Sequence, residues 1–198
     1  MTTSMMAMPV FAADDAATEE AAADVDLSDK RVGICIYQFS DNFMTLFRTE
    51  LENYLVELGF SKDNITIQDG ANDQATQSNQ IDAFIADGVD LLIINPVNSS
   101  SAESITDTVV AANLPLVYVN REPSEDEEKR WEENGWNVTY VGCDARQSGT
   151  MQGEIIADLG LDTIDKNGNG QVDYIMIDGD PENVDAKYRT VFSVKALE

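Results

Sequence analysis

The chain has 198 residues, which is long for one minimal domain and short for two complete α/β domains. Acidic residues outnumber basic residues 37 to 12, and the formal net charge of −25 gives a surface that repels nucleic acid and anionic lipid, so neither is an expected partner. Hydrophobic residues make up 43% of the chain, which excludes a disordered acidic polymer and predicts a packed core.

Residues 1–12 are interpreted as the remainder of a secretory signal peptide, although a basic start and a long apolar run are missing. Val10 and Ala12 are the small residues that signal peptidase requires before its cleavage site. The alternative is a disordered cytosolic leader. Residues 13–30 are acidic and lack an apolar stripe, which predicts a disordered tether. No stretch reaches the roughly 18 apolar residues of a membrane span. The expected location is the periplasm or the outer face of the cell membrane.

From Arg31 onward, short apolar runs alternate with amphipathic segments, and this pattern predicts an α/β fold with parallel strands joined by helical crossovers. Most runs are continuously apolar, as expected of strands that are covered by helices on both faces. The predicted strands cover residues 32–37, 64–68, 91–95, 116–119, 138–141 and 174–177.

Helices are predicted between and after these strands. The first begins near Asn42 and ends before Gly59, with an apolar stripe of Phe43, Phe47, Leu51, Tyr54, Leu55 and Leu58. The others cover about residues 74–87, a segment that follows the serine caps at 99–101, residues 147–159, and a segment that begins near Asp185 and continues to Glu198.

The two cysteines, Cys35 and Cys143, both lie in apolar strand-like runs and are interpreted as buried free thiols, with a disulfide or a catalytic role as the alternatives. The chain contains no histidine. This absence excludes Ser–His and Cys–His nucleophile pairs and the commonest zinc ligand.

Ligands of an open α/β sheet gather outside the carboxyl ends of its strands, so the residues that follow each strand are the candidate site. These residues combine aromatic rings with planar polar groups, which is the chemistry that a pyranose requires. The candidates are Tyr37, Asp41 and Phe43 after the first strand, Asn95 after the third, and Asp185 and Arg189 after the sixth.

A plain structural interpretation of the same residues stays open on composition alone. Phe43 is then a core residue, Asp41 or Asn42 is a helix cap, and Asp185 forms a surface ion pair with Arg189 four residues later on one helix.

The segment Arg31-Val-Gly-Ile-Cys-Ile-Tyr37, followed by Asp41-Asn42-Phe43-Met44, resembles the bacterial periplasmic galactose/glucose-binding proteins. The resemblance continues in the same order over about residues 31–198, through Asn72-Asp73-Gln74, Asn79-Gln80-Ile81-Asp82, Gly88-Val89, Ile94-Asn95, Asn120-Arg121-Glu122-Pro123, Tyr140-Val141-Gly142 and Gln152-Gly153. It implies a periplasmic-binding-protein-like fold, in which two parallel-sheet lobes with helices on both faces close on a sugar.

The resemblance places Tyr37, Asp41, Phe43 and Asn95 on the first lobe's side of the sugar, and Asn183, Asp185 and Arg189 on the second lobe's side. Phe43 is expected to stack on the sugar, while the carboxylates, Asn95 and Arg189 bond its hydroxyl groups. The family usually carries a sugar-contacting histidine where this chain has Asn183. We expect a first lobe over residues 31–119, a hinge at 120–124 and a partial second lobe over 125–198, with the chain stopping before that lobe is complete.

Residues 165–173 follow the pattern of an EF-hand loop, which predicts a calcium site. Its candidate ligands are Asp165, Asn167, Asn169, the carbonyl of Gln171 and Asp173. The last position of the pattern holds Met176 instead of glutamate, and the resembling family supplies a distant glutamate from beyond the end of this chain. The predicted site is therefore weak. A plain turn is the alternative.

The predicted function is that of a non-enzymatic, monomeric binding protein for galactose, glucose or a related monosaccharide. Its expected partners are the membrane subunits of an ABC transporter and a chemoreceptor. One alternative is the sugar-sensing core of a LacI-type transcription regulator, against which stand the acidic charge and the signal-like leader. Another is a glycosidase, for which no nucleophile arrangement is visible.

Overall fold

Five strands form one parallel sheet in the computed structural model, which describes residues 25–180 and 183–198. The strand order is β2-β1-β3-β4-β5, so each strand is joined to the next through a helical crossover, as parallel pairing requires. Of the six predicted strands, the first five agree with the observed ones to within one residue at each end. The strands are β1 (Val32–Ile36), β2 (Ile65–Asp69), β3 (Leu91–Ile94), β4 (Leu116–Val119) and β5 (Val138–Val141).

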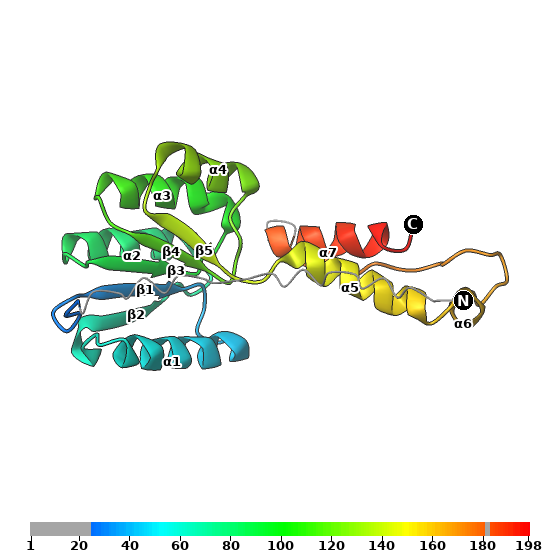
Figure 1. The fold of residues 1–198 in the computed structure, drawn as a ribbon, viewed down its shortest axis with the longest axis horizontal. Coiled ribbons are helices and arrows are strands. Elements are labelled where there is room, and N and C mark those ends of the chain that lie inside the picture. The colour runs from blue at the N-terminus through cyan, green and yellow to red at the C-terminus, as the bar shows by residue number, and fades with distance from the viewer. Residues whose placement is uncertain (1–24, 181–182) are drawn as a thin grey trace, which may run out of the picture.

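Helices cover both faces of this sheet (Figure 1). Helix α1 lies on one face, and α2, α3 and α4 lie on the other. The α-helices are α1 (Asn42–Glu57), α2 (Gln74–Ala86), α3 (Ala102–Ala111), α4 (Glu125–Asn134), α5 (Ala145–Asp158), α6 (Leu161–Ile164) and α7 (Val184–Lys195), with short 3-10 helices at η1 (Lys62–Asn64) and η2 (Ser99–Ser101). No helix in the described ranges combines the length and the apolar character that crossing a membrane needs.

Successive side chains of each central strand enter opposite layers of the core. In β1, Val32, Ile34 and Ile36 face the layer under α1, whereas Cys35 faces α2 and α3. This two-sided burial explains why the strand sequences are continuously apolar. Burial raises the pKa of the Cys35 thiol to about 12, so it stays protonated. Both cysteines are free, as predicted, but the prediction that Cys143 is buried is wrong, because it follows the edge strand and is exposed.

The buried stripe of α1 is narrower than predicted. Met44 and Leu55 are buried, and Phe47 and Leu51 pack against the same core layer. These four positions lie almost in line along the helix, whereas Phe43 and Tyr54 lie on its flank and Leu58 is the C-cap beyond the last turn. These three residues are exposed, with exposed fractions of 61% for Phe43, 58% for Tyr54 and 48% for Leu58.

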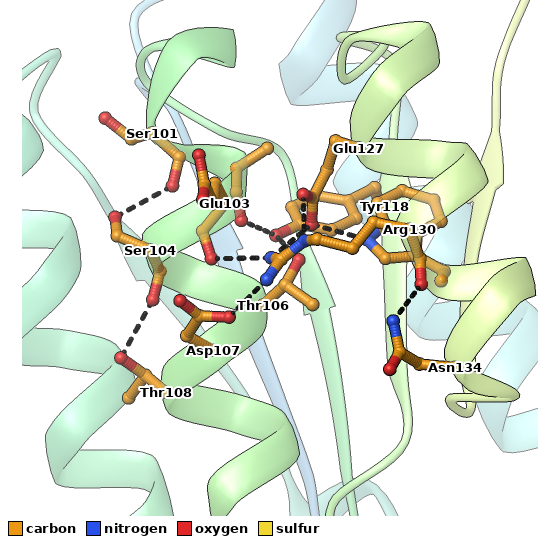
Figure 2. Close-up of polar contacts among 12 residues, drawn as sticks. Ser101, Glu103, Ser104, Thr106, Asp107, Thr108, Tyr118, Glu127, Arg130 and Asn134 are labelled. Atoms are coloured by element: carbon orange, nitrogen blue, oxygen red, sulfur yellow. Dashed lines mark hydrogen bonds and ion pairs between the residues drawn. The ribbon is translucent and has the colours of Figure 1, made fainter.

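Helix α4 was not predicted, because it has no apolar stripe beyond Trp131, whose ring stacks on that of Tyr118 at 5.4 Å. A polar network holds it against α3 instead (Figure 2). The buried Glu127 carboxylate accepts from Arg130 Nε at 2.7 Å, and Arg130 Nη1 donates to Asp107 Oδ1 of α3 at 2.6 Å. Because every charged partner in this network is bonded, the buried carboxylate is tolerated.

The predicted boundary between the lobes is wrong, because β5 pairs with β4 in the same sheet. The predicted hinge at 120–124 leads into α4, which packs on this sheet through Trp131. The chain leaves the sheet only after Val141. We call residues 32–141 the sheet unit and residues 145–198 the helical unit; the crossing between them is 142–144.

Two glycines let α5 and α7 of the helical unit lie in close contact. A Cβ atom on Gly149 would lie 2.8 Å from the Arg189 carbonyl oxygen, and one on Gly153 would lie 2.5 Å from that of Ser193. Any larger residue would therefore push the helices apart. The second lobe is present only in part, since the described residues of the helical unit contain no strand.

The strand predicted at 174–177 is wrong. That segment has no regular structure, and the side chains of Ile175 and Ile177 are 93% and 91% exposed. A strand needs a neighbour to satisfy its backbone N–H and C=O groups, and the described residues provide none beside it.

Candidate functional site

The parallel strands end at one edge of the sheet, and hydrogen bonds tie the loops there into a single surface. The amide of Asn95, directly after β3, accepts from the Tyr37 N–H after β1 at 3.2 Å. The same amide donates to the Val119 carbonyl at the end of β4 at 2.9 Å. Asn95 therefore joins the ends of three strands.

Both amide atoms of Asn95 are thus used inside the protein, and its side chain is fully buried. The main-chain carbonyl of Asn95 accepts from Gln77 Nε2 of α2 at 2.9 Å. In this structure Asn95 has a structural role, because its hydrogen bonds hold together the segments that lie beneath the candidate site. Direct contact of Asn95 with a sugar stays a prediction, and it requires one of these internal bonds to be exchanged for a bond to the ligand.

Tyr37 and Asp41 lie together, as the sequence predicted. The Tyr37 hydroxyl donates to Asp41 Oδ2 at 2.8 Å, while Asp41 Oδ1 accepts from the Met44 N–H at 2.8 Å and caps α1. The cap and the Tyr37 bond both lower the pKa of Asp41, so it is ionised at neutral pH. Burial, then the neighbouring carboxylate, raises the pKa of Tyr37. The alternative that Asp41 caps a helix is confirmed, and it leaves room for a second role at Oδ2.

Phe43 is not a core residue, since 61% of its side chain is exposed. Its ring centroid lies 6.2 Å from that of Phe47, with the planes tilted by 32°. Two residues after the Asp41 cap, the ring is therefore open to solvent. An exposed aromatic face beside a carboxylate is an arrangement that suits the C–H face of a sugar ring.

Arg121 is the main site residue that the sequence analysis missed. Its guanidinium lies 3.9 Å from the centroid of the Tyr37 ring, and it donates to the carbonyls of Pro96 and Val97. Its charge helps to lower the pKa of Asp41 and opposes the rise in that of Asp185. The rule that selected Asp41, a polar residue just after a strand, also applies to Arg121 after β4.

Glu122 follows Arg121 and is 4% exposed. Its Oε1 accepts from Arg146 Nη2 of α5 at 3.0 Å, while its Oε2 has no hydrogen-bond partner. Burial raises the pKa of this carboxyl, and Arg146 opposes that rise. Glu122 thus lies where the sheet unit meets the helical unit.

The remaining predicted sugar residues lie at the start of α7. Asn183 caps this helix, and its Oδ1 accepts from the Asp185 N–H at 2.9 Å and the Ala186 N–H at 3.3 Å. Asp185 is 9% exposed, and its Oδ1 has no hydrogen-bond partner. Burial raises its pKa, and the charges of Arg189 and Arg121 only partly offset this effect.

The alternative interpretation, in which Asp185 and Arg189 form a surface ion pair, is wrong, because the ion pairs among the described residues do not include this one. Arg189 is half-buried, and its positive charge lowers the pKa of Asp185 without a direct ion pair. A buried carboxylate oxygen without a donor favours a hydroxyl or another donor as its partner.

A cavity of about 430 Å³ lies where α3, α4 and α7 approach one another, next to the predicted sugar residues but not lined by them. Its walls include Ser99, Ser124, Glu127, Val184 and Lys187. Glu127 and its neighbour Arg130 are engaged in the polar network of Figure 2. We therefore place the candidate site on the Tyr37, Asp41 and Arg121 cluster rather than in this cavity.

The predicted calcium loop forms a tight turn at the end of the helical unit far from the sheet (Figure 1). Asp165 accepts from the N–H groups of Gly168 and Gly170, each at 2.7 Å, and the bond from Gly170 makes the largest contribution to its lowered pKa. The amides of Asn167 and Asn169 donate to Asp173 Oδ2 at 2.6 and 3.0 Å. The loop thus gathers all four predicted side-chain ligands, while the fifth predicted ligand is the main-chain carbonyl of Gln171.

This arrangement fits a cation only in part. Turning the two asparagine amides over would point their oxygens, instead of their nitrogens, toward Asp173. Gly168 and Gly170 have φ values of 70° and 78°, which glycine adopts without strain. However, the described residues contain no group of three or more histidine, cysteine or acidic side chains that is arranged to hold a metal.

Known proteins resemble this chain over most of its length. The sequence model of the periplasmic binding protein domain matches residues 32–198. The D-galactose/methyl-galactoside binding periplasmic protein MglB of Haemophilus influenzae is 31% identical over 172 residues, which are 86% of this chain and 50% of that protein. The chain spans about half the length of the curated relatives that it matches.

Solved structures agree with this result. A solute binding protein of an ABC transporter from Bacillus halodurans C-125, with bound myo-inositol, has a TM-score of 0.69 and 26% identity, over 87% of this chain and 53% of that one. Another, from Clostridium phytofermentans with bound β-D-glucose, has a TM-score of 0.68 and 23% identity, over 85% of this chain and 48% of that one, and supports the fold alone.

Proposed function

This chain belongs to the family of the periplasmic binding protein domain, and from that premise we propose that it binds galactose, glucose or a related monosaccharide. The observation that carries the proposal is the cluster at the carboxyl edge of the sheet. Asp41 presents a carboxylate oxygen next to Tyr37, Arg121 lies over the Tyr37 ring, and the nearby Phe43 ring is exposed. Carboxylate and guanidinium groups bond adjacent hydroxyls, and an aromatic ring packs on a sugar's apolar face.

The second half of the proposed site comes from α7. Asp185 carries a buried oxygen without a donor, and the charge of Arg121 already reaches it. A sugar hydroxyl would supply the missing donor. Asn183 is engaged as the cap of α7, so we expect it to modify selectivity through the position of this helix rather than to replace the family's histidine directly.

Titration calorimetry of the gene product that contains this chain tests the proposal, with D-galactose, D-glucose and myo-inositol as ligands. We expect saturable binding of at least one of them. Asp41→Ala should weaken it by about 1.5–3 kcal/mol, the range for a hydrogen bond to a charged group. Glu50→Ala is the matched control, because Glu50 is exposed on the same helix. Absence of heat with every sugar, or equal effects of the two variants, would contradict the proposal.

We also propose that the protein is a non-enzymatic monomer that works outside the cytoplasm. Its partners would be the membrane subunits of an ABC transporter and, for chemosensing, a chemoreceptor. The name of the Haemophilus influenzae relative, a periplasmic binding protein, supports this location. The predicted cleavage after Ala12 lies outside the described residues, as does most of the predicted tether. Mass spectrometry of the mature protein should find Ala13 at its N-terminus.

The regulator alternative is less well supported. The relatives and solved structures described above are named as periplasmic or transporter binding proteins. The net charge of −25 also opposes binding to DNA. A shift of labelled DNA by this protein at physiological salt would favour the regulator.

A calcium ion is the second proposed ligand, held by the loop of Asp165, Asn167, Asn169, Gln171 and Asp173. These residues offer five oxygens, and Ca²⁺ prefers about six to eight, so water or a further residue must complete the shell. An ion present at about 100 times its Kd would stabilise the fold by about 2.7 kcal/mol.

Melting temperatures in calcium and in chelator test this second proposal. We expect a higher value in calcium, and Asp165→Ala should abolish the difference. Asp162→Ala is the control, since Asp162 is an exposed acidic residue just before the loop. If Asp162→Ala reduces the calcium response as much as Asp165→Ala, or if the native protein shows none, the loop does not hold the ion.

A further inference from the structure

Arg146 lies on the first turn of α5, directly after the crossing between the two units, and it bonds back to the sheet unit. Its Nη2 donates to Glu122 Oε1 at 3.0 Å, and its Nη1 donates to Glu125 Oε1 at 3.3 Å. Its Nε lies 3.1 Å from Asp144 Oδ1. One guanidinium therefore bonds two carboxylates of the sheet unit and one at the end of the crossing.

The same side chain also contacts α7. The Arg146 guanidinium carbon lies 4.6 Å from the centroid of the Tyr188 ring, and the Tyr188 hydroxyl donates to Glu125 Oε1 at 3.5 Å. Tyr188 is one turn after Asp185 on this helix. A contact that fixes Tyr188 therefore also fixes the position of α7 along and around its axis, and with it the position of Asp185 relative to the sheet edge.

No other ion pair among the described residues joins the two units. The side chain of Glu122 is 5% exposed and that of Arg146 is 29% exposed, so water screens this pair far less than a surface pair. Besides Arg146, the groups that act on the Glu122 charge include Asp185 of α7 and Asp144, and both are acidic. Removing Arg146 would leave a buried carboxylate facing like charges.

We propose that Arg146 is a positioning residue, which sets where α7, and with it Asp185, lies against the sheet unit. The proposal concerns the arrangement of the two units without ligand, so it goes beyond sugar binding and does not depend on which sugar binds. Arg130 provides the comparison, because it makes a similar set of ion pairs with Glu127 and Asp107, entirely within the sheet unit.

Distance measurements between spin labels on the two units test the proposal. Labels would be attached at Asp82→Cys on α2 and Glu154→Cys on α5, both exposed positions, in a Cys143→Ser background. The remaining Cys35 is fully buried and will not react. Double electron–electron resonance then gives the distribution of distances in the native pair, in Arg146→Gln and in Arg130→Gln.

We expect Arg146→Gln to broaden and shift the distribution, and Arg130→Gln to leave it unchanged while lowering the melting temperature. An unchanged distribution in Arg146→Gln, or equal broadening in both variants, would overturn the proposal. If Arg146→Gln fails to fold, Arg146→Lys keeps the charge but loses the forked hydrogen bonds and should give partial broadening; no broadening there would equally overturn it. The double variant Glu122→Gln/Arg146→Gln removes the uncompensated carboxylate charge, so its melting temperature should recover while its distance distribution stays broad. Recovery of the native distribution would overturn the proposal, because it would show that the unpaired Glu122 charge, and not the loss of positioning, had caused the broadening.

Discussion

The two carboxylate oxygens of Asp41 have different partners, and a pair of substitutions can separate its role as a helix cap from its proposed role in sugar binding. Oδ1 caps α1 at the Met44 N–H, whereas Oδ2 accepts from Tyr37 and is the atom that we propose bonds the sugar. Asp41→Ala removes both. Asp41→Ser keeps an oxygen that can cap the helix but removes the carboxylate. Loss of an N-cap costs about 0.5–2 kcal/mol, and 1 kcal/mol lowers the melting temperature of a chain of this size by about 2–4 °C.

Thermal unfolding and sugar titration should therefore rank the variants differently. Asp41→Ala should melt lower than Asp41→Ser, because only the alanine variant leaves the first turn of α1 without a cap. In titration both variants should lose about 10- to 150-fold in affinity, which corresponds to 1.5–3 kcal/mol. If Asp41→Ser binds sugar as tightly as the native protein, then Asp41 is a helix cap and nothing more. If both variants melt at the same temperature, the cap contributes nothing measurable.

Two further predictions concern the helical unit. Burial raises the pKa of Asp185 above its ordinary value of 3.8, so the stability that this carboxyl contributes is present at low pH and is lost as the pH rises through its folded-state pKa. Asp185→Asn should therefore raise the melting temperature more at about pH 7 than at about pH 4. An equal effect at both pH values would refute the burial argument. Gly153→Ala should force α5 from α7 at a cost of about 1–3 kcal/mol, partly offset by about 1 kcal/mol of helix propensity. Hydrogen exchange should then speed up in α5 and α7 but not in the sheet, with Glu154→Ala as the exposed control; unchanged exchange would contradict the close contact.

The central strands β1, β3 and β4 could be predicted from the sequence because they are covered on both faces and carry almost no polar residue. Leu91–Ile94 and Leu116–Val119 are continuous apolar runs that match the structure in position and pairing type. Helix α4 could not be found in this way. It is anchored by Trp131 and by the Glu127 and Arg130 network, and a row of acidic residues with one aromatic has no helical hydrophobic period.

For the site, the rule that ligand residues follow the strands selected Tyr37 and Asp41, which do lie together. The same rule cannot tell an outward residue from an inward one. Asn95 follows β3 but turns into the protein to bond Tyr37 and Val119. Arg121 follows β4 and lies over the Tyr37 ring, where it remains partly exposed. The direction depends on neighbouring loops, which are distant in the sequence.

The position of the crossing explains how the two halves of the candidate site are joined. Because β5 belongs to the sheet, Arg121 and Glu122 lie in the sheet unit. The chain continues through α4 and β5 before it crosses to the helical unit at 142–144. Arg146 then begins the helical unit beside Glu122. A crossing at 120–124 would have placed Glu122 within the crossing itself and Glu125 in the same unit as Arg146. The observed topology instead makes Glu122 and Arg146 a contact between the two units that carry the two halves of the proposed sugar site.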